Sequence, residues 1–338
     1  MKQKAEPFYL LLQHYTLWDD IIHLFFQPPQ QRMNKPQKKR KLNGVLLLDK
    51  PTGLSSNSAL QKARRIFNAE KAGHTGVLDP LATGLLPVCF GEATKFAQYL
   101  LDADKGYTAT LKLGEATTTG DAEGEIIATA PIPESREGFQ AACTALTGAI
   151  RQVPPMFSAL KHEGRPLYEY ARKGIVIERK PRDIIIHSIE ITEFSPPKAV
   201  IDVRCSKGTY IRTLSEDIAK KMGTFAHLTA LRRTETAGFS INQTHTLESL
   251  EALNETERDT LLLPCDALVQ HLPEIHLNNN EIKQLRFGQQ PACHNQNLPA
   301  ETPLRAYSIQ NEFIGLIEYL PRYACLKSVR LMNTGNAI

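Results

Sequence analysis

The sequence predicts an α+β fold with a mixed, largely antiparallel central sheet, flanking helices and a small C-terminal β-barrel. Strand-like and helix-like segments alternate irregularly and are joined by links of hairpin length, which favours a mixed or antiparallel sheet. Hydrophobic residues make up 42% of the 338 residues, enough to bury a core, and a charged fraction of 22% excludes wholesale disorder. At about 150 residues per domain, the length corresponds to about two domains.

The first half of the body contains well-marked elements. The apolar run GVLLLDKP (44–51) predicts a buried strand that ends in a polar turn. Ser55, Ser56 and Asn57 are candidate N-caps for a helix over 57–67. Glycines and prolines then indicate a loop before an apolar strand at 85–90. The expected elements that follow are a helix at 92–101, strands at 106–113 and 125–130, and a helix at 135–147.

The second half predicts further strands and a separate C-terminal part. Residues 150–174 are loop-like and then helical, and 183–194 and 199–206 are typical of strands. Helical periodicity predicts a helix at 210–222, another helical turn at 225–232 and a Glu-rich helix with a connecting segment at 251–272. Three β-runs after Pro273 suggest a small closed barrel.

The charge of the chain is concentrated in one short segment. Residues 31–41 hold six of the 40 Lys and Arg residues and no acid, which leaves 34 bases against 36 acids elsewhere. The body is therefore not uniformly basic, and any nucleic-acid surface must come from local segregation of charge. The basic segment itself fits a nucleic-acid arm, a nuclear address or a solvated linker.

Residues 1–42 form an atypical N-terminal extension. The apolar stretch 7–27 is interrupted by acids and histidines and is followed by PPQQ, so it fits neither a membrane span nor a secretory signal. A short amphipathic helix is the favoured interpretation. Met33 precedes the basic run, and we hypothesise that translation starts there.

No motif for a metal or a cofactor occurs. The six cysteines form no CxxC pair, which favours reduced, mostly buried thiols, and the histidines lack metal-ligand spacing. GxGxxG, GxxxxGK[ST] and GxSxG are also absent. We therefore expect no cofactor and no metal, and chemistry that side chains alone can perform.

The loop GHTGVLDPLATGLLP (73–87) contains the most informative carboxylate. Asp79 precedes a proline, which keeps it out of helical conformation, and leucines surround it. One interpretation is a tight turn capped by Asp79. The other is a buried functional carboxylate, which needs a cationic or hydrogen-bonding partner to stay charged.

Arg212, in KGTYIRTLSEDI (207–218), is the candidate partner of Asp79. At a strand-to-helix junction, Arg212 and Tyr210 can both enter one cleft. The alternative is a surface pair of Arg212 with Glu216, worth about 0.3–0.5 kcal/mol. Tyr107 lies in a predicted strand, where ordinary core or edge packing is the alternative to a functional role.

Several ordered motifs resemble one known family. They are GHTGVLDPLATGLLP, KGYTATLKLG, GTYIRTLSEDI, the early DKP (49–51), QVPPMFSALKHEGRPLYEYARKG (152–174) and LRRTETAGF (231–239). Together they resemble the TruB-type branch of the pseudouridine synthase family. The resemblance runs from about residue 43 to the C-terminus, and residues 1–42 have no counterpart in it.

The resemblance implies an activity, a domain organisation, a partner and a location. The family isomerises uridine to pseudouridine in RNA, and this branch acts on uridine 55 in the T-loop of tRNA, without a cofactor. The implied parts are a catalytic domain at 43–272, containing an RNA-binding insert at 152–182, and a PUA-like RNA-binding domain at 273–338. The resemblance further implies tRNA, through its T-arm, as the partner, no membrane, no obligate protein partner, a monomer and a cytoplasmic location.

The resemblance also implies catalytic roles. Asp79 would be the nucleophile, Arg212 would pair with it, and Tyr107 would stack on the target base and accept a proton. Arg212 would keep Asp79 ionised through a bidentate hydrogen bond inside a closed, dry pocket. Whether Asp79 attacks the sugar or the base, or abstracts a proton, stays open.

Binding roles are implied in the same way. Tyr210 and Leu231 would line the nucleoside pocket, and His74 would contact the RNA where the target base leaves the loop. Lys50 and Pro51 would support the pocket floor. Two alternative functions remain: a guide-RNA-directed pseudouridine synthase subunit that needs partner proteins, and a tRNA-folding chaperone in which binding is the main role.

Overall fold

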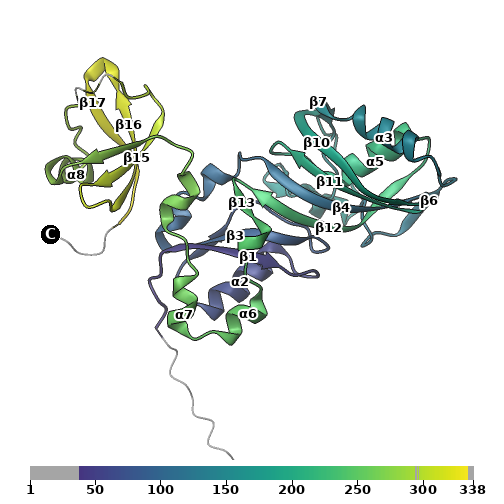
Figure 1. The fold of residues 1–338 in the computed structure, drawn as a ribbon, viewed down its shortest axis with the longest axis horizontal. Coiled ribbons are helices and arrows are strands. Elements are labelled where there is room, and N and C mark those ends of the chain that lie inside the picture. The colour runs from purple at the N-terminus through teal and green to yellow at the C-terminus, as the bar shows by residue number, and fades with distance from the viewer. Residues whose placement is uncertain (1–37, 294, 296, 334–338) are drawn as a thin grey trace, which may run out of the picture. The chain divides into compact units, whose positions relative to one another are not determined.

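The computed structural model describes residues 38–293, 295 and 297–333. Contacts divide the chain into two units, Met1–Lys39 and Arg40–Ile338, and the fold described below is that of the second unit (Figure 1). The amphipathic helix expected at 7–27 and the proposed start at Met33 lie outside the described residues. Within the described part of the chain, no helix is long and apolar enough to cross a membrane.

A mixed sheet forms the centre of this unit, as the sequence predicted. Its main path runs β1-β3-β12-β4-β11-β10-β7, with β2 paired to β3 and β13 to β12. All pairings are antiparallel except that of β12 with β3. The strands are β1 (Gly44–Lys50), β2 (Ala72–His74), β3 (Thr83–Phe90), β4 (Lys105–Leu113), β7 (Gly148–Gln152), β10 (Arg182–Ser195), β11 (Lys198–Cys205), β12 (Ala226–Thr236) and β13 (Phe239–Ser240).

Strand β1 is apolar throughout because both of its faces are covered. Leu46 and Leu48 belong to the main core, whereas Val45 and Leu47 belong to a second core on the other face. Alternate residues of a strand point to opposite faces, so a strand buried on both sides reads as a continuous apolar run. Helices α2 (Ser56–Ile66) and α6 (Leu247–Ala252) pack against β3 and β1 respectively (Figure 1).

Helix α2 begins at a residue suited to capping, whereas one expected helix has a different form. Ser55 is the N-cap of α2, since its side chain accepts a hydrogen bond from the amide of Ser58. The expected helix at 92–101 is instead two 3₁₀ helices, η1 (Gly91–Lys95) and η2 (Ala97–Leu100). The remaining helices are α3 (Arg136–Thr144), α4 (Leu167–Ala171), α5 (Ile211–Lys221), α7 (Glu255–Thr260), α8 (Asn279–Arg286), η3 (Ile241–Gln243), η4 (Cys265–Val269) and η5 (Pro321–Tyr323).

The expected helical turn at 225–232 is wrong, because this segment is the first part of β12. Its pairing with β4 shifts register between Leu228 and Ala230. Such a β-bulge interrupts the two-residue period of a strand. Leu228 and Leu231 are both buried although they are three residues apart, and that spacing imitates a helix.

A second sheet forms at the C-terminus, but it is not the closed barrel that the sequence suggested. Its strands are β14 (Glu274–Leu277), β15 (Pro303–Ser308), β16 (Phe313–Leu320) and β17 (Cys325–Leu331). Among the described residues the order is the open path β14-β15-β16-β17. Closure requires the end strands to pair with matching tilt and stagger, whereas β14 pairs only with β15 and β17 only with β16.

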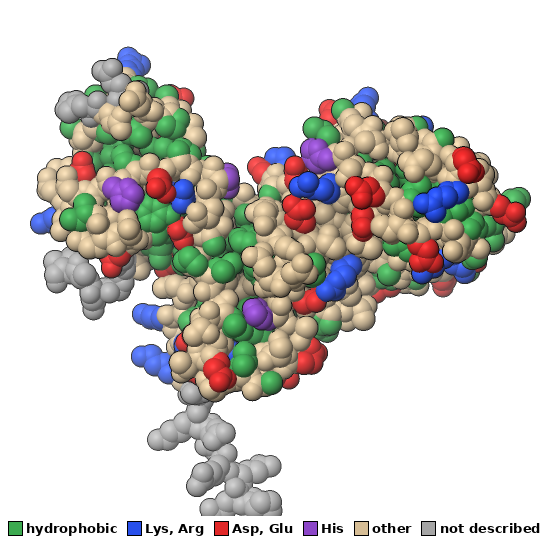
Figure 2. Space-filling model, in the orientation of Figure 1, with side chains coloured by type: hydrophobic (Ala, Val, Ile, Leu, Met, Phe, Trp, Pro, Cys, Tyr) green, Lys and Arg blue, Asp and Glu red, His purple; other side chains and the backbone are tan. Residues whose placement is uncertain are grey.

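Smaller elements complete the fold. Two short two-stranded sheets are separate from the two larger sheets: β5 (Glu115–Thr117) pairs with β6 (Ile126–Thr129), and β8 (Lys161–His162) pairs with β9 (Arg165–Pro166). All six cysteines are free, and five of them are buried, which confirms the expectation of reduced, mostly buried thiols. On the face drawn in Figure 2, acidic and basic side chains are interspersed, in keeping with the predicted absence of a uniform basic coat.

Gly84 allows the close parallel approach of β3 to β12. Its φ is +101°, and a Cβ atom there would lie 2.3 Å from the carbonyl oxygen of Arg233. We expect Gly84→Ala to lower the free energy of unfolding by more than about 2 kcal/mol, because two backbones must separate. Urea denaturation measures this loss. The control is Gly223→Ala, at φ +73° in open space, which we expect to lose only about 1 kcal/mol; equal losses would contradict the prediction.

Candidate active site

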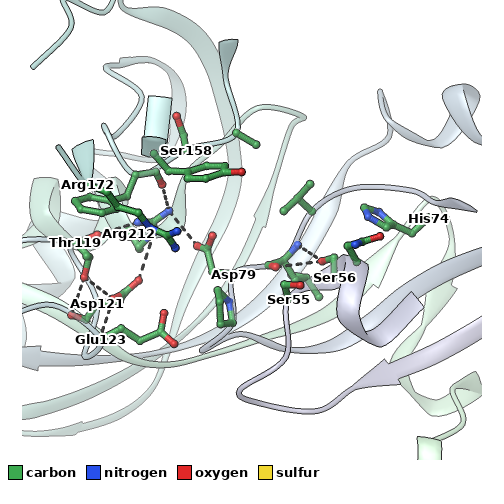
Figure 3. Close-up of a pocket in the computed structure, with 17 residues that line it drawn as sticks. Ser55, Ser56, His74, Asp79, Thr119, Asp121, Glu123, Ser158, Arg172 and Arg212 are labelled. Carbon is green, nitrogen blue, oxygen red and sulfur yellow. Dashed lines mark hydrogen bonds and ion pairs between the residues drawn. The ribbon is translucent and has the colours of Figure 1, made fainter. Parts of the chain in front are cut away.

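Asp79 lies in the loop between β2 and β3, which is fastened to the start of α2. The amide of Leu78 donates to Ser56 Oγ (2.8 Å), and Ser56 Oγ donates to the carbonyl of Leu78 (3.1 Å). The amide of Ala82 donates to the carbonyl of Asp79 (3.1 Å). These bonds fix the backbone on both sides of the carboxylate, so Asp79 is held by a structured turn (Figure 3).

Arg212 reaches Asp79 from the first turn of α5. Its Nη2 lies 3.1 Å from Asp79 Oδ2, so the ion pair implied by the resemblance is present. The pair is not bidentate, because Arg212 also donates to the carbonyls of Thr119 (2.9 Å) and Phe157 (2.6 Å). Arg212 is only 5% exposed, so the alternative of a surface pair with Glu216 is wrong.

A second carboxylate lies on the other side of Arg212. Asp121 Oδ2 is 3.8 Å from Arg212 Nε, and Asp121 is itself buried. Thr119 Oγ1 and the amide of Glu123 donate to Asp121 Oδ1. The Arg212 guanidinium therefore lies between two carboxylates (Figure 3). Asp121 is held by its own turn, whereas Asp79 faces open space.

The surroundings of Asp79 oppose its charge as well as support it. Burial raises the pKa of the Asp79 carboxyl above its ordinary value, and Asp121 adds to this. Arg212 and Lys50 act in the opposite direction. The Asp79 side chain is still 38% exposed, so the site is open rather than closed and dry as expected.

Two cavities, each of about 560 Å³, meet at Asp79 and Arg212. The first extends from His74 toward Asp121 and the segment at 157–172 (Figure 3). The second is lined by the other predicted pocket residues, Tyr107, Tyr210 and Leu231, together with Lys105 and Arg233. Volumes of this size fit a small organic ligand such as a nucleoside.

Strands of the central sheet position several residues that line the second cavity. Tyr107 on β4 is paired with Val203 on β11 and with Arg233 on β12. Tyr107 and Leu231 are buried, and Tyr210 is the N-cap residue of α5. Burial raises the pKa of the Tyr107 and Tyr210 hydroxyl groups. Tyr107 is thus a buried side chain, as ordinary packing requires, and also part of the cavity wall.

Of the remaining predicted site residues, His74 lines a cavity, whereas Lys50 and Pro51 do not. His74 lines the first cavity, and burial together with Arg233 lowers the pKa of its ring. Lys50 is fully buried under the Asp79 loop and donates to the carbonyls of Pro51 (2.9 Å), Leu54 (2.6 Å) and Pro80 (3.4 Å). Lys50 and Pro51 line neither cavity, so they lie beneath the site rather than in its wall.

Two charged residues of the site, Asp121 and Arg233, were not predicted from the sequence. Asp121 follows Gly120 in a glycine-containing turn, GDAEG (120–124), the same kind of signal that marked Asp79. Arg233 is the second arginine of LRR, and nothing in that run indicates that it is buried while Arg232 faces Asp49. Among the described residues, no group of His, Cys, Asp and Glu could hold a metal ion.

Comparisons with known proteins identify the family of this chain. Residues 64–211 match the family described as TruB family pseudouridylate synthase (N terminal domain), and 212–270 match the tRNA pseudouridylate synthase B C-terminal domain. The chain is 73% identical over 300 residues to tRNA pseudouridine synthase B of Neisseria meningitidis serogroup B, covering 89% of this chain and 97% of that protein. This chain belongs to the TruB family of pseudouridylate synthases.

More distant members and solved structures extend the comparison. The chain is also 54% identical over 288 residues to tRNA pseudouridine synthase B of Chromobacterium violaceum. This match covers 85% of this chain and 94% of that protein. The archaeal box H/ACA sRNP Nop10-Cbf5 complex shares the fold, with a TM-score of 0.65, 23% identity and 86% of each chain covered. The TruB-family residues from 64 to 270 thus include both sides of the Asp79–Arg212 pair.

The buried ammonium of Lys50 makes stability depend on pH. Burial lowers the pKa of Lys50 from 10.5 to about 8. Between these values the unfolded chain binds the proton and the folded chain does not, so stability rises with pH across that window. We expect the wild type to gain up to about 3 kcal/mol there relative to Lys50→Met, which lacks the titrating group.

Urea denaturation of both proteins between pH 7 and 10.5 measures this difference. Taking the difference removes contributions that the two proteins share, such as those of buried tyrosines and cysteines. A wild-type curve parallel to that of Lys50→Met would contradict the prediction.

Proposed function

We propose that the protein isomerises uridine to pseudouridine in tRNA, and that its target is uridine 55 of the T-loop. The observation that carries the proposal is the Asp79–Arg212 ion pair at the meeting point of two cavities. Relatives 73% and 54% identical to this chain carry the name tRNA pseudouridine synthase B. The specific uridine is inferred from the resemblance of the motifs.

The proposed reaction proceeds on a base that has left the RNA stack. Flipping a base out costs a few kcal/mol, and stacking against an aromatic ring such as Tyr107 returns roughly 1–3 kcal/mol. The N1–C1′ bond then breaks, the uracil turns over, and C5 bonds to C1′. Asp79 faces the cavity in which this occurs and supplies the carboxylate that attacks the sugar or base or takes a proton.

Arg212 has the role of keeping the Asp79 carboxylate charged and in place. Its guanidinium is fixed by two backbone carbonyls and does not depend on the substrate for its position. A preorganised charge of this kind acts without reorganisation during the reaction. Tyr210 and Leu231 contribute the apolar wall of the nucleoside pocket, and Lys50 and Pro51 support the turn from below.

We further propose how the chain holds tRNA. Residues 43–272 make up the catalytic part, and 273–338 form a PUA-like second RNA-binding part. The insert 152–182 presents exposed basic side chains beside the first cavity, where His74 would meet the RNA. These basic side chains are Lys161, Arg165, Arg172, Lys173, Lys180 and Arg182. The protein would act as a monomer in the cytoplasm without a protein partner.

The role of Asp79 is tested by Asp79→Asn. Loss of the carboxylate removes the nucleophile, so we expect pseudouridine formation in unmodified tRNA transcript to fall by at least about 10³-fold while tRNA binding persists. Chemical mapping of pseudouridine in a single turnover measures this. The matched control is Asp259→Asn, which removes an ion pair with Arg40 and lines neither cavity.

The outcomes of this experiment separate the functions. Wild-type protein that modifies the transcript alone needs no guide RNA or partner protein. An Asp79→Asn protein that keeps the reaction contradicts the nucleophile role. A variant that loses the reaction but still refolds tRNA would show that a chaperone role exists beside the enzyme.

Binding of tRNA is expected to weaken with salt. Each phosphate contact releases counterions, so log K falls with log salt by about 0.9 for each contact. We expect Arg165→Gln with Lys173→Gln to reduce the slope by about 2. Filter binding at several salt concentrations measures it, with Lys198→Gln as the control because Lys198 is already paired with Glu193. A flat wild-type plot would refute the proposed basic interface.

A further inference from the structure

Arg233 is the direct cross-strand neighbour of Tyr107. In the antiparallel pairing of β12 with β4, the Cα atoms of these two residues are partners. Residues directly opposite each other have Cβ atoms about 4.5–5.5 Å apart on the same face of the sheet. Both side chains line the cavity that also contains Asp79. Arg233 is 1% exposed, so its charge is held inside the protein.

The guanidinium of Arg233 is anchored at one end and unsatisfied at the other. Nε donates to the carbonyl of Leu85 (2.7 Å), whereas the buried Nη2 has no hydrogen-bond partner. Gly76 gives it room, because a Cβ atom at that glycine would lie 3.3 Å from Nη1. A buried, unpaired donor is costly, so its presence beside the cavity calls for an explanation.

Within the part of the chain that the structure describes, no acidic side chain forms an ion pair with this buried cation. Arg212 contacts two carboxylates, but the group whose charge favours the charged form of Arg233 is the Tyr107 hydroxyl. Among the described residues, the other titratable groups that interact electrostatically with Arg233 or Tyr107 lie on neighbouring elements: Lys50 on β1, His74 on β2, Lys105 on β4, Cys205 on β11 and Asp79 in its loop. An uncompensated guanidinium stabilises negative charge that forms beside it.

We propose that Arg233 is a positioning residue for the reaction, which holds the Tyr107 hydroxyl and stabilises its phenolate while Tyr107 takes the proton from C5. This inference rests on the proposed function. It assigns the two buried arginines to different parts of the site. Arg212 supports the carboxylate that faces the sugar, and Arg233 supports the hydroxyl that faces the base.

The proton balance of this step closes without a further reactant. Bonding of C5 to C1′ gives a tautomer of pseudouridine that carries its proton on C5 and lacks one on N1. Tyr107 gives its hydroxyl proton to N1 and becomes a phenolate. The phenolate then takes the C5 proton, and the electron pair of the C5–H bond restores the C5=C6 double bond. Tyr107 ends as it began.

The surroundings explain why the phenolate needs this support. Burial raises the pKa of Tyr107, which disfavours the phenolate, and the adjacent Arg233 lowers it. Asp79 and Cys205 act with burial. Without Arg233, the pKa of Tyr107 would rise further. Less phenolate would then form, and removal of the C5 proton, which depends on the phenolate, would become the slow step.

The test compares Arg233→Gln with the wild type in single turnovers on tRNA whose target uridine carries hydrogen or deuterium at C5. We expect the variant to lose at least about 100-fold in rate and to show a deuterium isotope effect larger than that of the wild type. A merely structural role would not change the isotope effect. The matched control is Arg232→Gln, the next residue on β12, which points away toward Asp49 (Nη2 to Oδ2, 2.7 Å).

Each outcome decides the inference. A folded Arg233→Gln protein that binds tRNA and keeps the wild-type rate overturns it, and so does a slow variant without an increased isotope effect. If Arg233→Gln fails to fold, Arg233→Lys replaces it, with an expected loss of about tenfold and the same isotope signature. Wild-type protein that forms no pseudouridine would refute the proposed function instead, so the two failures are distinguishable.

Discussion

The contact between Asp79 and Arg212 brings together segments that the chain order keeps far apart. Arg212 touches the Asp79 turn, the Thr119 carbonyl with neighbouring Asp121, and the Phe157 carbonyl. A guanidinium has five donors in a rigid plane, so one side chain can bind several loops at once. Each loop contributes to the cavities that meet at this contact. Placing one buried cation therefore defines the shape of the site as well as the charge of its carboxylate.

That charge is a balance between burial and pairing. Burial and Asp121 raise the pKa of Asp79, whereas Arg212 lowers it. A buried pair gains from its Coulomb energy only when geometry and extra hydrogen bonds are good, because desolvation is costly. Here the exposed edge of Asp79 keeps part of its solvation, and the backbone carbonyls satisfy Arg212. The arrangement leaves the carboxylate free on the side that faces the two cavities.

Local signals in the sequence predicted the parts of the site that local chemistry controls. Proline after Asp79 and a strand-to-helix junction at Tyr210 gave the turn and the approach of Arg212. The apolar run at 44–51 predicted a buried strand, and the structure covers both of its faces. What local signals could not supply was register: the bulge after Leu228 made β12 resemble a helix, and the pairing of Arg233 with Tyr107 depends on how two distant strands align. The C-terminal sheet was recognised, but whether its end strands pair is likewise a long-range property.

The same long-range pairing explains why so many rigid elements surround one turn. Lys50 on β1 donates to the carbonyl of Pro80, and Ser56 on α2 holds Leu78 through both backbone groups. The residues on either side of Asp79 are thus fixed from two elements, and the side chain is fixed from a third, α5. Errors of about 1 Å in a reacting group can cost 10²-fold in rate. A loop is ordinarily a less precise place for a functional group than a helix or a strand, and these three anchors give the Asp79 loop the precision of the sheet and helices around it.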